Sequence, residues 1–187
     1  MMKYIFAIHG AFSSPKIFNY LKTQLGPTYH WRFLNYQDET GGFNKIINSI
    51  PDFSEPHYVI GHSMGGLMAL GIFPKPWVRS ITTIATPLGG VDVNLMQQYL
   101  SRSEFMSDIN SHGDLIQKLS KIQTNKPVQH LISTNGFNPW VYEPNDGVVT
   151  LRSQRAYNLG VSHDIPSNHA EVMLNELTVD ILRKFWN

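Results

Sequence analysis

Apolar runs alternate along the chain with segments that have one apolar face, and this alternation predicts most of the fold. The short apolar runs are rich in β-branched and aromatic residues, which is typical of buried strands. The longer segments space their apolar residues as amphipathic helices do. The predicted strands span residues 4–8, 31–36, 57–61, 78–85, 128–134 and 160–166.

The predicted helices fill the intervals between these strands and follow the last one. Gly26-Pro27, Pro51 and Pro74 end the first three helices, because proline cannot donate the next helical hydrogen bond. Strands that alternate with helices predict a mostly parallel sheet with helices on both faces. The predicted helices span residues 17–25, 43–50, 64–73, 93–105, 115–122 and 171–185, and the last has Val172, Leu174, Leu177, Ile181 and Leu182 on one side.

The stretch "YVIGHSMGGLMALGIF", residues 58–73, places Ser63 at a turn from a strand into a helix. Its core, "GHSMG", fits the pattern G-x-S-x-G. Such a sharp turn strains the serine backbone, and the flanking glycines remove side chains that would clash. The serine hydroxyl is then exposed at a helix N-terminus, where the helix dipole favours developing negative charge. The alternative is a glycine-rich turn that only lets helix and strand pack closely.

Composition narrows the class of protein. The 187 residues are 42% hydrophobic and 16% charged, which indicates one globular domain over residues 1–187. The net charge of +1 gives no electrostatic basis for binding nucleic acid. There is no cysteine, so disulfides and a thiol nucleophile are excluded, and a zinc site would need histidine and carboxylate ligands alone.

The sequence predicts neither a membrane span nor a signal peptide. No apolar run reaches the roughly 18 residues that a membrane helix needs. The opening "MMKYIFAIHG" has one lysine and a short apolar run, and no small-residue cleavage site follows it. We therefore interpret this run as the first strand and predict a cytoplasmic protein.

The chain resembles the α/β-hydrolase superfamily, and within it the small lipases and esterases. The resemblance lies in "FAIHGAFSS", "GHSMGG", "IATPLGG", "NDGVV" and "NHAEVM", which occur in the family's order between residues 4 and 185. In the family the His-Gly turn follows the third strand, whereas His9-Gly10 follows the first predicted strand here. The resemblance therefore implies a minimal α/β-hydrolase fold, with a six-stranded sheet that lacks the family's first two strands.

The same resemblance implies a catalytic triad of Ser63, Asp146 and His169. A serine hydroxyl needs a base to act as a nucleophile at neutral pH, and the order Ser…Asp/Glu…His is the one this fold uses. Asp146 follows the fifth predicted strand, and His169 lies just before the last helix. Asn-Asp-Gly is also a turn signal in its own right. The alternatives are Glu143 or Asp164 as the acid and His163 as the base.

The remaining histidines of the strands and turns have structural interpretations. His62 adjoins Ser63 in sequence and is expected to support the turn, because neighbours on a tight turn point in different directions. His9 is expected to fix its loop by hydrogen bonds. His57 and His130 lie at or inside predicted strands and are expected to be structural.

Two backbone N–H groups are candidates for an oxyanion hole. The N–H of Met64, at the start of the helix, is suited to donate to an oxyanion. The resemblance implies that Ala11 supplies the second donor, with Phe12 as the alternative if the loop is shifted by one residue. The sequence reads HGAFSS where many lipases have HGGG, so the donor and the pocket differ in detail.

A substrate pocket and a possible lid complete the predicted site. Phe12, Leu88, Trp140 and Val148 are candidate lining residues, with core packing as the alternative. The interval from Pro87 to Pro127 leaves room for at most a small cap near residues 101–113. No H-E-x-x-H motif occurs, and neither a metal nor a cofactor is expected.

These features predict a serine hydrolase that cleaves carboxylic esters through an acyl-enzyme on Ser63. The expected partner is a small-molecule ester, which includes lipid-like esters. The first alternative is a thioesterase or acyltransferase that uses the same triad, since a fold does not separate these activities. The second alternative is a binding protein that keeps the fold without activity.

Overall fold

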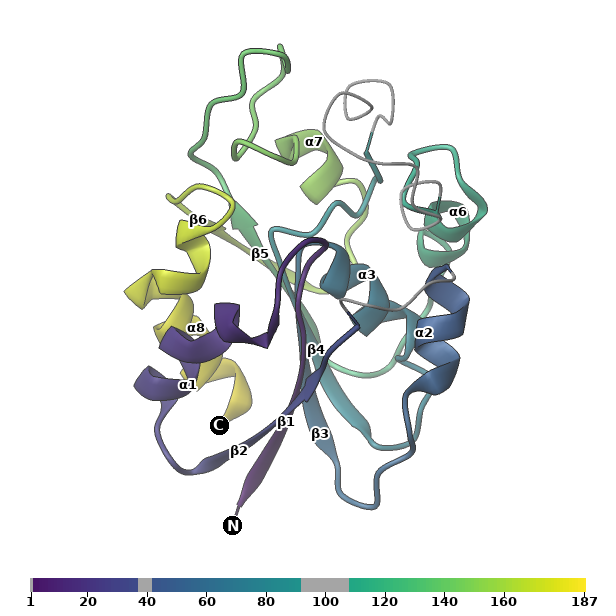
Figure 1. Ribbon diagram of the computed structural model, residues 1–187, viewed down its shortest axis with the longest axis vertical. Helices are drawn as coiled ribbons and strands as arrows, with labels where there is room; N and C mark the ends of the chain where they lie inside the picture. Colours follow the sequence, from purple (N-terminus) through teal and green to yellow (C-terminus); the bar gives the residue numbers. More distant parts are fainter. Residues whose placement is uncertain (1, 37–41, 92–107) are drawn as a thin grey trace.

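A computed structural model describes residues 2–36, 42–91 and 108–187, and within them six strands form one parallel sheet (Figure 1). The strand order is β2-β1-β3-β4-β5-β6, and each neighbouring pair is parallel. This confirms the predicted sheet. The strands are β1 (Lys3–Ile8), β2 (Tyr29–Leu34), β3 (His57–His62), β4 (Val78–Ile84), β5 (Val128–Ser133) and β6 (Val161–Ile165).

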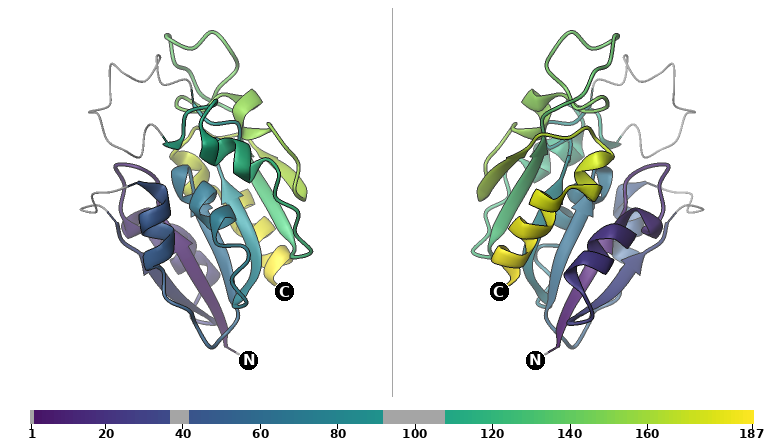
Figure 2. Two further views of the ribbon diagram at one scale, coloured as in Figure 1. Left: turned by 90° about the vertical axis from the view of Figure 1, so that its right-hand side faces the viewer. Right: turned by 90° about the vertical axis from the view of Figure 1, so that its left-hand side faces the viewer.

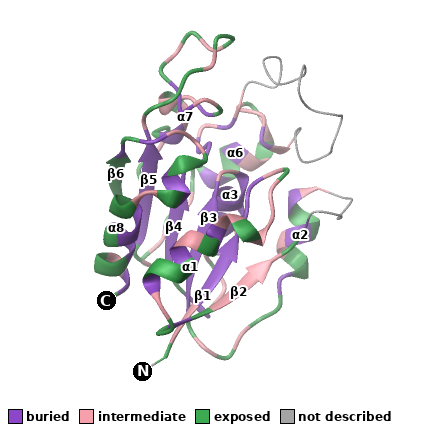
Figure 3. Cartoon of the chain, turned by 60° about the vertical axis from the view of Figure 1, so that its left-hand side comes forward, coloured by how far each residue is buried: buried purple, intermediate pink, exposed green. Residues whose placement is uncertain are grey.

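The inner strands are buried on both faces, which explains their nearly continuous apolar sequences. Every residue of β3 and of β5 is buried, and β4 exposes only Arg79. The edge strands β2 and β6 are more exposed, and burial in Figure 3 is greatest at the centre of the sheet. This difference explains why the last strand is the least apolar of the six.

Helices cover both faces of the sheet, as the alternation of elements predicts (Figure 2). On one face lie α1 (Asn19–Leu25) and α8 (Glu176–Trp186), which contact each other. On the other lie α2 (Phe43–Ser49), α3 (Met64–Gly71) and α6 (Asp114–Leu119). The 3₁₀ helices η1 (Pro15–Phe18) and η2 (Glu171–Leu174) precede α1 and α8, and the short α7 (Leu151–Gln154) follows β5.

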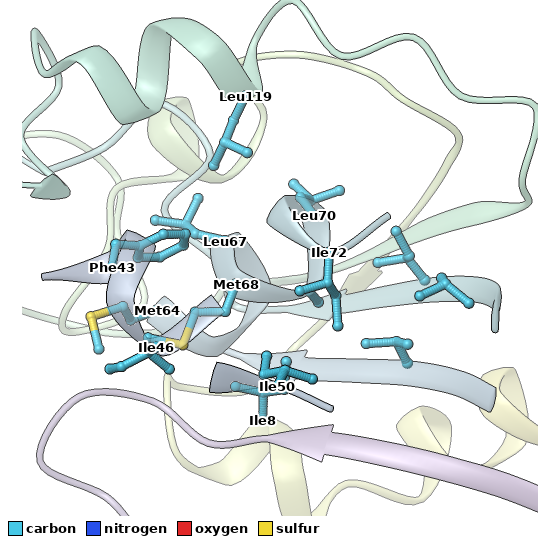
Figure 4. Close-up of a cluster of buried hydrophobic side chains, with 14 of the residues drawn as sticks. Ile8, Phe43, Ile46, Ile50, Met64, Leu67, Met68, Leu70, Ile72 and Leu119 are labelled. Carbon is cyan, nitrogen blue, oxygen red and sulfur yellow. The ribbon is translucent and has the colours of Figure 1, made fainter. Parts of the chain in front are cut away.

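Each face of the sheet has its own hydrophobic core. The core around α3 is shown in Figure 4, where Leu67 and Met68 of α3 lie among side chains of α2 and the sheet. All but the last residue of α3 are buried, so this helix is apolar around its whole circumference. The second core packs Phe18, Leu182 and Trp186 against the opposite face of β1 and β3. The central helix α3 and the strand before it are therefore the most enclosed part of the fold.

The predicted C-terminal helix is wrong in one respect. A single helix was expected over residues 171–185, but the chain forms η2 and then α8, with Asn175 between them. The Asn175 side chain accepts a hydrogen bond from the N–H of Leu177 and caps α8. This break shifts the helical phase, so Leu174 and Leu177 are exposed while Ile181 and Leu182 are buried.

The other predicted helices agree with the structure to within a few residues where it describes them. The segment 17–25 divides into η1 and α1, and 115–122 corresponds to α6. The expected helix at 93–105 and most of the expected cap near 101–113 lie outside the described residues. No helix in the described ranges is long and apolar enough to cross a membrane.

His130 is a buried polar residue of the sheet, on the strand between β4 and the edge strand β6. It lies on β5, is 1% exposed, and its Nδ1 is hydrogen-bonded to Thr83 Oγ1 on β4 at 2.7 Å. Burial lowers the pKa of His130 from 6.5 to about 4. Below pH 6.5 the unfolded chain therefore binds a proton that the folded chain excludes, and stability falls as the pH falls towards 4.

This titration predicts the effect of His130→Asn, which keeps a polar atom near the position of Nδ1 and removes the imidazole. The wild-type free energy of unfolding should fall more steeply between pH 6.5 and 4 than that of the variant. The difference between the two curves should change by about 2–3 kcal/mol over this range. Urea unfolding followed by tryptophan fluorescence at several pH values measures it, and parallel curves would contradict the assignment.

Candidate active site

Ser63 occupies a strained turn between β3 and α3, as the sequence predicts. Its φ of 54° and ψ of −126° lie in a region that non-glycine residues rarely adopt. Its N–H donates to the carbonyl of Ile84 at 2.8 Å, and its carbonyl accepts from the N–H of Gly66 at 2.9 Å. The turn is therefore fixed on one side to β4 and on the other to the first turn of α3.

Two glycines of the G-x-S-x-G pattern are required by close backbone contacts. A Cβ on Gly61 would collide with the carbonyl of Gly65, and a Cβ on Gly65 would collide with the carbonyl of Ile8 at the end of β1. Neither obstacle is a flexible side chain, so the backbone itself would have to move. The glycines thus allow the Ser63 turn to press against β1.

The loop after β1 lies directly against this turn. A Cβ on Gly10 would lie 2.9 Å from the Cβ of Ser63. His9 fixes the loop as predicted: its Nδ1 donates to the carbonyl of Gly10 at 2.8 Å, and its ring stacks on Tyr36 at 4.2 Å between centroids. The hydroxyl of Tyr36 in turn donates to the carbonyl of His9 at 2.6 Å.

The two candidate oxyanion donors adjoin, in sequence, the two residues that make the close contact, Gly10 and Ser63. Met64 is the first residue of α3, and Ala11 follows Gly10 in the adjacent loop. Among the hydrogen bonds of the described residues, neither N–H donates to a protein acceptor. Phe12 has a φ of 54°, so the loop is strained one residue beyond Ala11. Their role in binding an oxyanion stays a prediction.

Asp146 lies in a turn whose shape directs its carboxylate inward. The side chain of Asn145 accepts from the N–H of Gly147 at 2.8 Å, and the N–H of Asp146 donates to the carbonyl of Val149 at 3.0 Å. Gly147 has a φ of 99°. The turn interpretation of "NDG" is therefore correct, and the turn also buries the Asp146 carboxylate, whose role as a catalytic acid stays a prediction.

Within the described part of the chain, five hydrogen bonds converge on the Asp146 carboxylate, which is 0% exposed. Oδ1 accepts from the backbone N–H groups of Val148 at 2.9 Å and Val149 at 2.7 Å. Oδ2 accepts from Ser133 Oγ at 2.5 Å, Gln154 Nε2 at 3.1 Å and His169 Nδ1 at 2.7 Å. Burial alone would raise the pKa of Asp146, but the bonds from His169, Ser133 and the backbone outweigh it and lower the pKa below its ordinary value.

His169 is fixed to Asp146 through two groups. Its Nδ1–H donates to the carboxylate, and its backbone N–H donates to the carbonyl of Asp146 at 2.9 Å. This arrangement places the proton on Nδ1 and leaves the lone pair on Nε2, the form that a general base needs. Among the described residues no hydrogen bond joins Nε2 to Ser63 Oγ. The ring of His62, next to Ser63, lies 4.9 Å from the His169 ring between centroids.

The alternative acids and base lie in other contacts. Asp164 forms two 2.7 Å hydrogen bonds with the guanidinium of Arg155, and Glu143 pairs with Arg152 at 2.8 Å. His163 lies on the edge strand β6, opposite Leu131. Asp146 and His169 are therefore the acid and imidazole that the fold brings together.

The candidate pocket residues divide into two groups. Phe12, Trp140 and Val148 are exposed, in loops at the carboxyl end of the sheet. Leu88 is 1% exposed and packs in the core around α3, so for this residue the structure favours core packing over contact with a ligand.

The sequence prediction did not include Ser133 and Gln154, whose side chains donate to the Asp146 carboxylate. Gln154 on α7 is 0% exposed, and its amide bonds both the N–H and the carbonyl of Ser133 as well as Asp146. The position of Ser133 at the carboxyl end of a buried strand was a usable signal, since side chains there often serve a site. Nothing in the local sequence distinguishes Gln154 from a surface residue.

No group of three histidine or acidic side chains suited to a metal ion occurs in residues 2–36, 42–91 and 108–187. The bonds of Asp146 and His169 to each other and to protein donors account for their placement. The arrangement as a whole offers a hydroxyl on a strained turn, an oriented imidazole and a buried carboxylate.

Comparison with known proteins identifies the fold. No protein-family model matches the sequence, and no curated protein matches it. The structure is similar to a lipase of Bacillus licheniformis, BlEst2 in its mature form, with a TM-score of 0.75 and 13% identity over 100% of this chain and 92% of that one. It is also similar to a lipase-esterase related protein from Clostridium acetobutylicum, with a TM-score of 0.63 and 17% identity over 99% and 94% of the two chains.

A third similar structure is RedJ, a thioesterase of the prodiginine biosynthetic pathway in Streptomyces coelicolor. Its TM-score is 0.66, with 12% identity over 98% of this chain and 88% of that one. At such identities the likeness establishes the fold alone. The chain therefore has a minimal α/β-hydrolase fold, as the resemblance of its motifs implies.

The role of Gln154 predicts a large effect of Gln154→Leu, a substitution of similar size. It would leave the backbone groups of Ser133 unpaired and remove one donor from a buried carboxylate. The free energy of unfolding should fall by about 2–4 kcal/mol. Urea unfolding at neutral pH measures this loss. The same change at the exposed Gln24 on α1 is the control, and equal small effects at both positions would contradict the positioning role.

Proposed function

We propose that this protein is a serine hydrolase that cleaves carboxylic esters, with Ser63 as nucleophile, His169 as base and Asp146 as the acid that orients it. The observation that carries the proposal is the 2.7 Å bond between His169 Nδ1 and Asp146 Oδ2, made by a loop whose neighbour is the strained Ser63 turn. A strained serine, an oriented imidazole and a buried carboxylate have no common structural purpose. Together they form the parts of an acyl-transfer site.

In the proposed mechanism, His169 Nε2 accepts the proton of Ser63 Oγ as the oxygen attacks the ester carbonyl. The backbone N–H groups of Ala11 and Met64 stabilise the resulting oxyanion, and the dipole of α3 adds to this effect. The imidazolium then donates the proton to the departing alcohol, which leaves an acyl-enzyme. Water, activated by the same imidazole, hydrolyses the acyl-enzyme and restores Ser63.

Asp146 supports this cycle by remaining ionised. Its lowered pKa keeps the carboxylate charged, so it stabilises the imidazolium that forms in the transition state without taking the proton. Ser133 and Gln154 restrain the same oxygen that faces His169, which limits the orientations open to the imidazole.

Exposed apolar side chains on the loops that contain Ala11 and Asp146 support an ester with an apolar acyl group. Phe12 is 74% exposed and Trp140 is 57% exposed, and Val148 adjoins Asp146 through Gly147. The loop between β5 and α7, which includes Trp140, extends beyond the carboxyl end of the sheet (Figure 1). The lipase and lipase-esterase titles of similar structures support the same substrate class.

A thioesterase is the second candidate, supported by the similarity to the RedJ thioesterase. The triad would act in the same way on a thioester, because the attack is on the same kind of carbonyl carbon. Parallel turnover of p-nitrophenyl esters and acyl-CoA of equal chain length distinguishes the two. A larger kcat/KM on the oxygen ester is the result that the present proposal expects.

Ser63→Ala is expected to keep the fold and to abolish ester hydrolysis. The triad acts as a unit, so kcat should fall by about 10⁴-fold or more. Hydrolysis of a p-nitrophenyl ester panel, with thermal unfolding as the check on folding, makes the measurement. Ser120→Ala, at an exposed serine after α6, is the control. Near wild-type turnover in Ser63→Ala would end the proposal.

Asp146→Asn is expected to lower kcat by about 10³–10⁴-fold, because the amide favours the wrong imidazole tautomer.

The pH profile of the wild type should have one acidic limb, since a protonated His169 cannot accept the serine proton. Activity should decline in acid while Asp146, with its lowered pKa, remains charged. A profile without an acidic limb over the pH range in which the protein stays folded would be incompatible with a histidine base.

A further inference from the structure

His62 makes a contact that support of its own turn does not explain. Its Nε2 lies 2.8 Å from the backbone carbonyl of His169, 107 residues further along the chain. A carbonyl can only accept, so Nε2 carries the proton and donates it. The bond joins the residue before the nucleophile to the backbone of the base.

The surroundings of His62 restrict the orientation of its ring, so that Nε2 stays directed at the His169 carbonyl. The residue is 4% exposed, and its Nδ1 is buried without a hydrogen-bond partner among the described residues. A Cβ on Gly10 would lie 3.4 Å from this Nδ1, so the loop after β1 limits rotation of the ring on that side. The imidazole is therefore confined between the Gly10 loop and the His169 loop, with one strong donor directed at His169.

From this geometry we propose that His62 is a positioning residue, which sets the distance between His169 Nε2 and Ser63 Oγ by fixing the His169 backbone to the Ser63 turn. Asp146 determines the tautomer and the tilt of the His169 ring through Nδ1. His62 holds the third group of the same residue, its carbonyl, and does so from the residue that adjoins the nucleophile. The inference rests on the proposed function and specifies how its base is placed.

The charge state of His62 fits this role. Burial, with a smaller contribution from nearby His169, lowers the pKa of His62 to about 3, so the ring stays neutral at the pH values at which a histidine base works. A neutral ring donates one hydrogen bond and does not repel the imidazolium that forms on His169 during attack. A charged side chain at this position, 4.9 Å from the His169 ring, would oppose that step.

Three substitutions at His62 test the geometry. In His62→Gln the amide nitrogen reaches the place of imidazole Nε2, so the donor is retained. In His62→Asn the amide nitrogen reaches only the place of Nδ1, and His62→Leu has no donor. A displacement of about 1 Å at a reacting group can cost on the order of 100-fold in rate. We expect kcat to fall about 10- to 100-fold in the Asn and Leu variants with KM nearly unchanged, and the Gln variant to recover most of the loss.

His130 provides a matched control, because it is an equally buried histidine whose ring bonds to Thr83. His130→Gln and His130→Leu should lower the midpoint of thermal unfolding without a selective loss of kcat at a temperature where each variant is folded. If the His62 substitutions acted only by a general loss of packing, the His62 variants would show the same effects on stability and kcat as the two His130 variants. Such a loss of packing would lower stability in all three variants without distinguishing Gln from Asn.

The outcomes separate this inference from the proposed function. If Ser63→Ala abolishes turnover and the folded His62 variants all retain wild-type kcat, the positioning role is wrong while the hydrolase proposal stands. The positioning role is equally wrong if the Gln and Leu variants lose kcat to the same extent. If Ser63→Ala remains active, the proposed function itself fails. Loss of kcat in the Asn and Leu variants, with recovery in Gln, is the result that supports the inference.

Discussion

Contact between backbone and backbone at the Ser63 turn is the constraint on which the rest of the site depends. Gly61, Gly65 and Gly10 let β1, β3 and the start of α3 approach more closely than any side chain would allow. That approach bends the chain sharply enough to hold Ser63 at a positive φ. The energetic cost of the strained residue is on the order of 1–3 kcal/mol, and the buried helix α3 and the inner strands are rigid enough to bear it.

A second constraint acts on the other side of the site, where a fully buried carboxylate must be compensated. An unpaired charge in this position would destabilise the fold, and five donors to Asp146 remove that cost. Four of the five come from groups other than His169. These four bonds are sufficient to fix the position of the carboxylate, and the carboxylate in turn orients the His169 ring.

The two constraints meet at His169. Its ring and its N–H are bound to Asp146, and its carbonyl is bound to His62, which adjoins Ser63 in sequence. The bond from His62 to the His169 carbonyl connects the loop that contains His169 to the turn that contains Ser63. Loops are usually more mobile than the elements they join. Here the His169 loop is fixed through the ring, the N–H and the carbonyl of one residue, which is what the proposed role of His169 as a base requires.

The sequence predicts those features that depend on local patterns. The strands are visible as apolar runs. The close backbone contact at Ser63 is visible as the glycines on either side of it, within one short stretch of sequence. The division of residues 171–185 into two helices was missed because Asn175 acts as a cap, and a cap competes with an unbroken amphipathic pattern. The partnerships of Gln154 with Ser133 and of His62 with His169 could not be predicted, because they join residues 21 and 107 positions apart. Leu88 was ambiguous for the same reason, since a loop leucine in sequence gives no indication of what covers it.

The central claim is that Ser63 is a nucleophile activated by His169, and covalent labelling tests it most directly. A fluorophosphonate reacts with an activated serine and not with an ordinary hydroxyl, because it needs the base and the oxyanion donors together. The measurement is the intact mass after reaction, followed by peptide mapping of the adduct. One phosphonyl group per chain is expected on the peptide that contains Ser63, and none in Ser63→Ala. An unlabelled but folded wild-type protein, or an adduct on a different serine, would contradict the central claim.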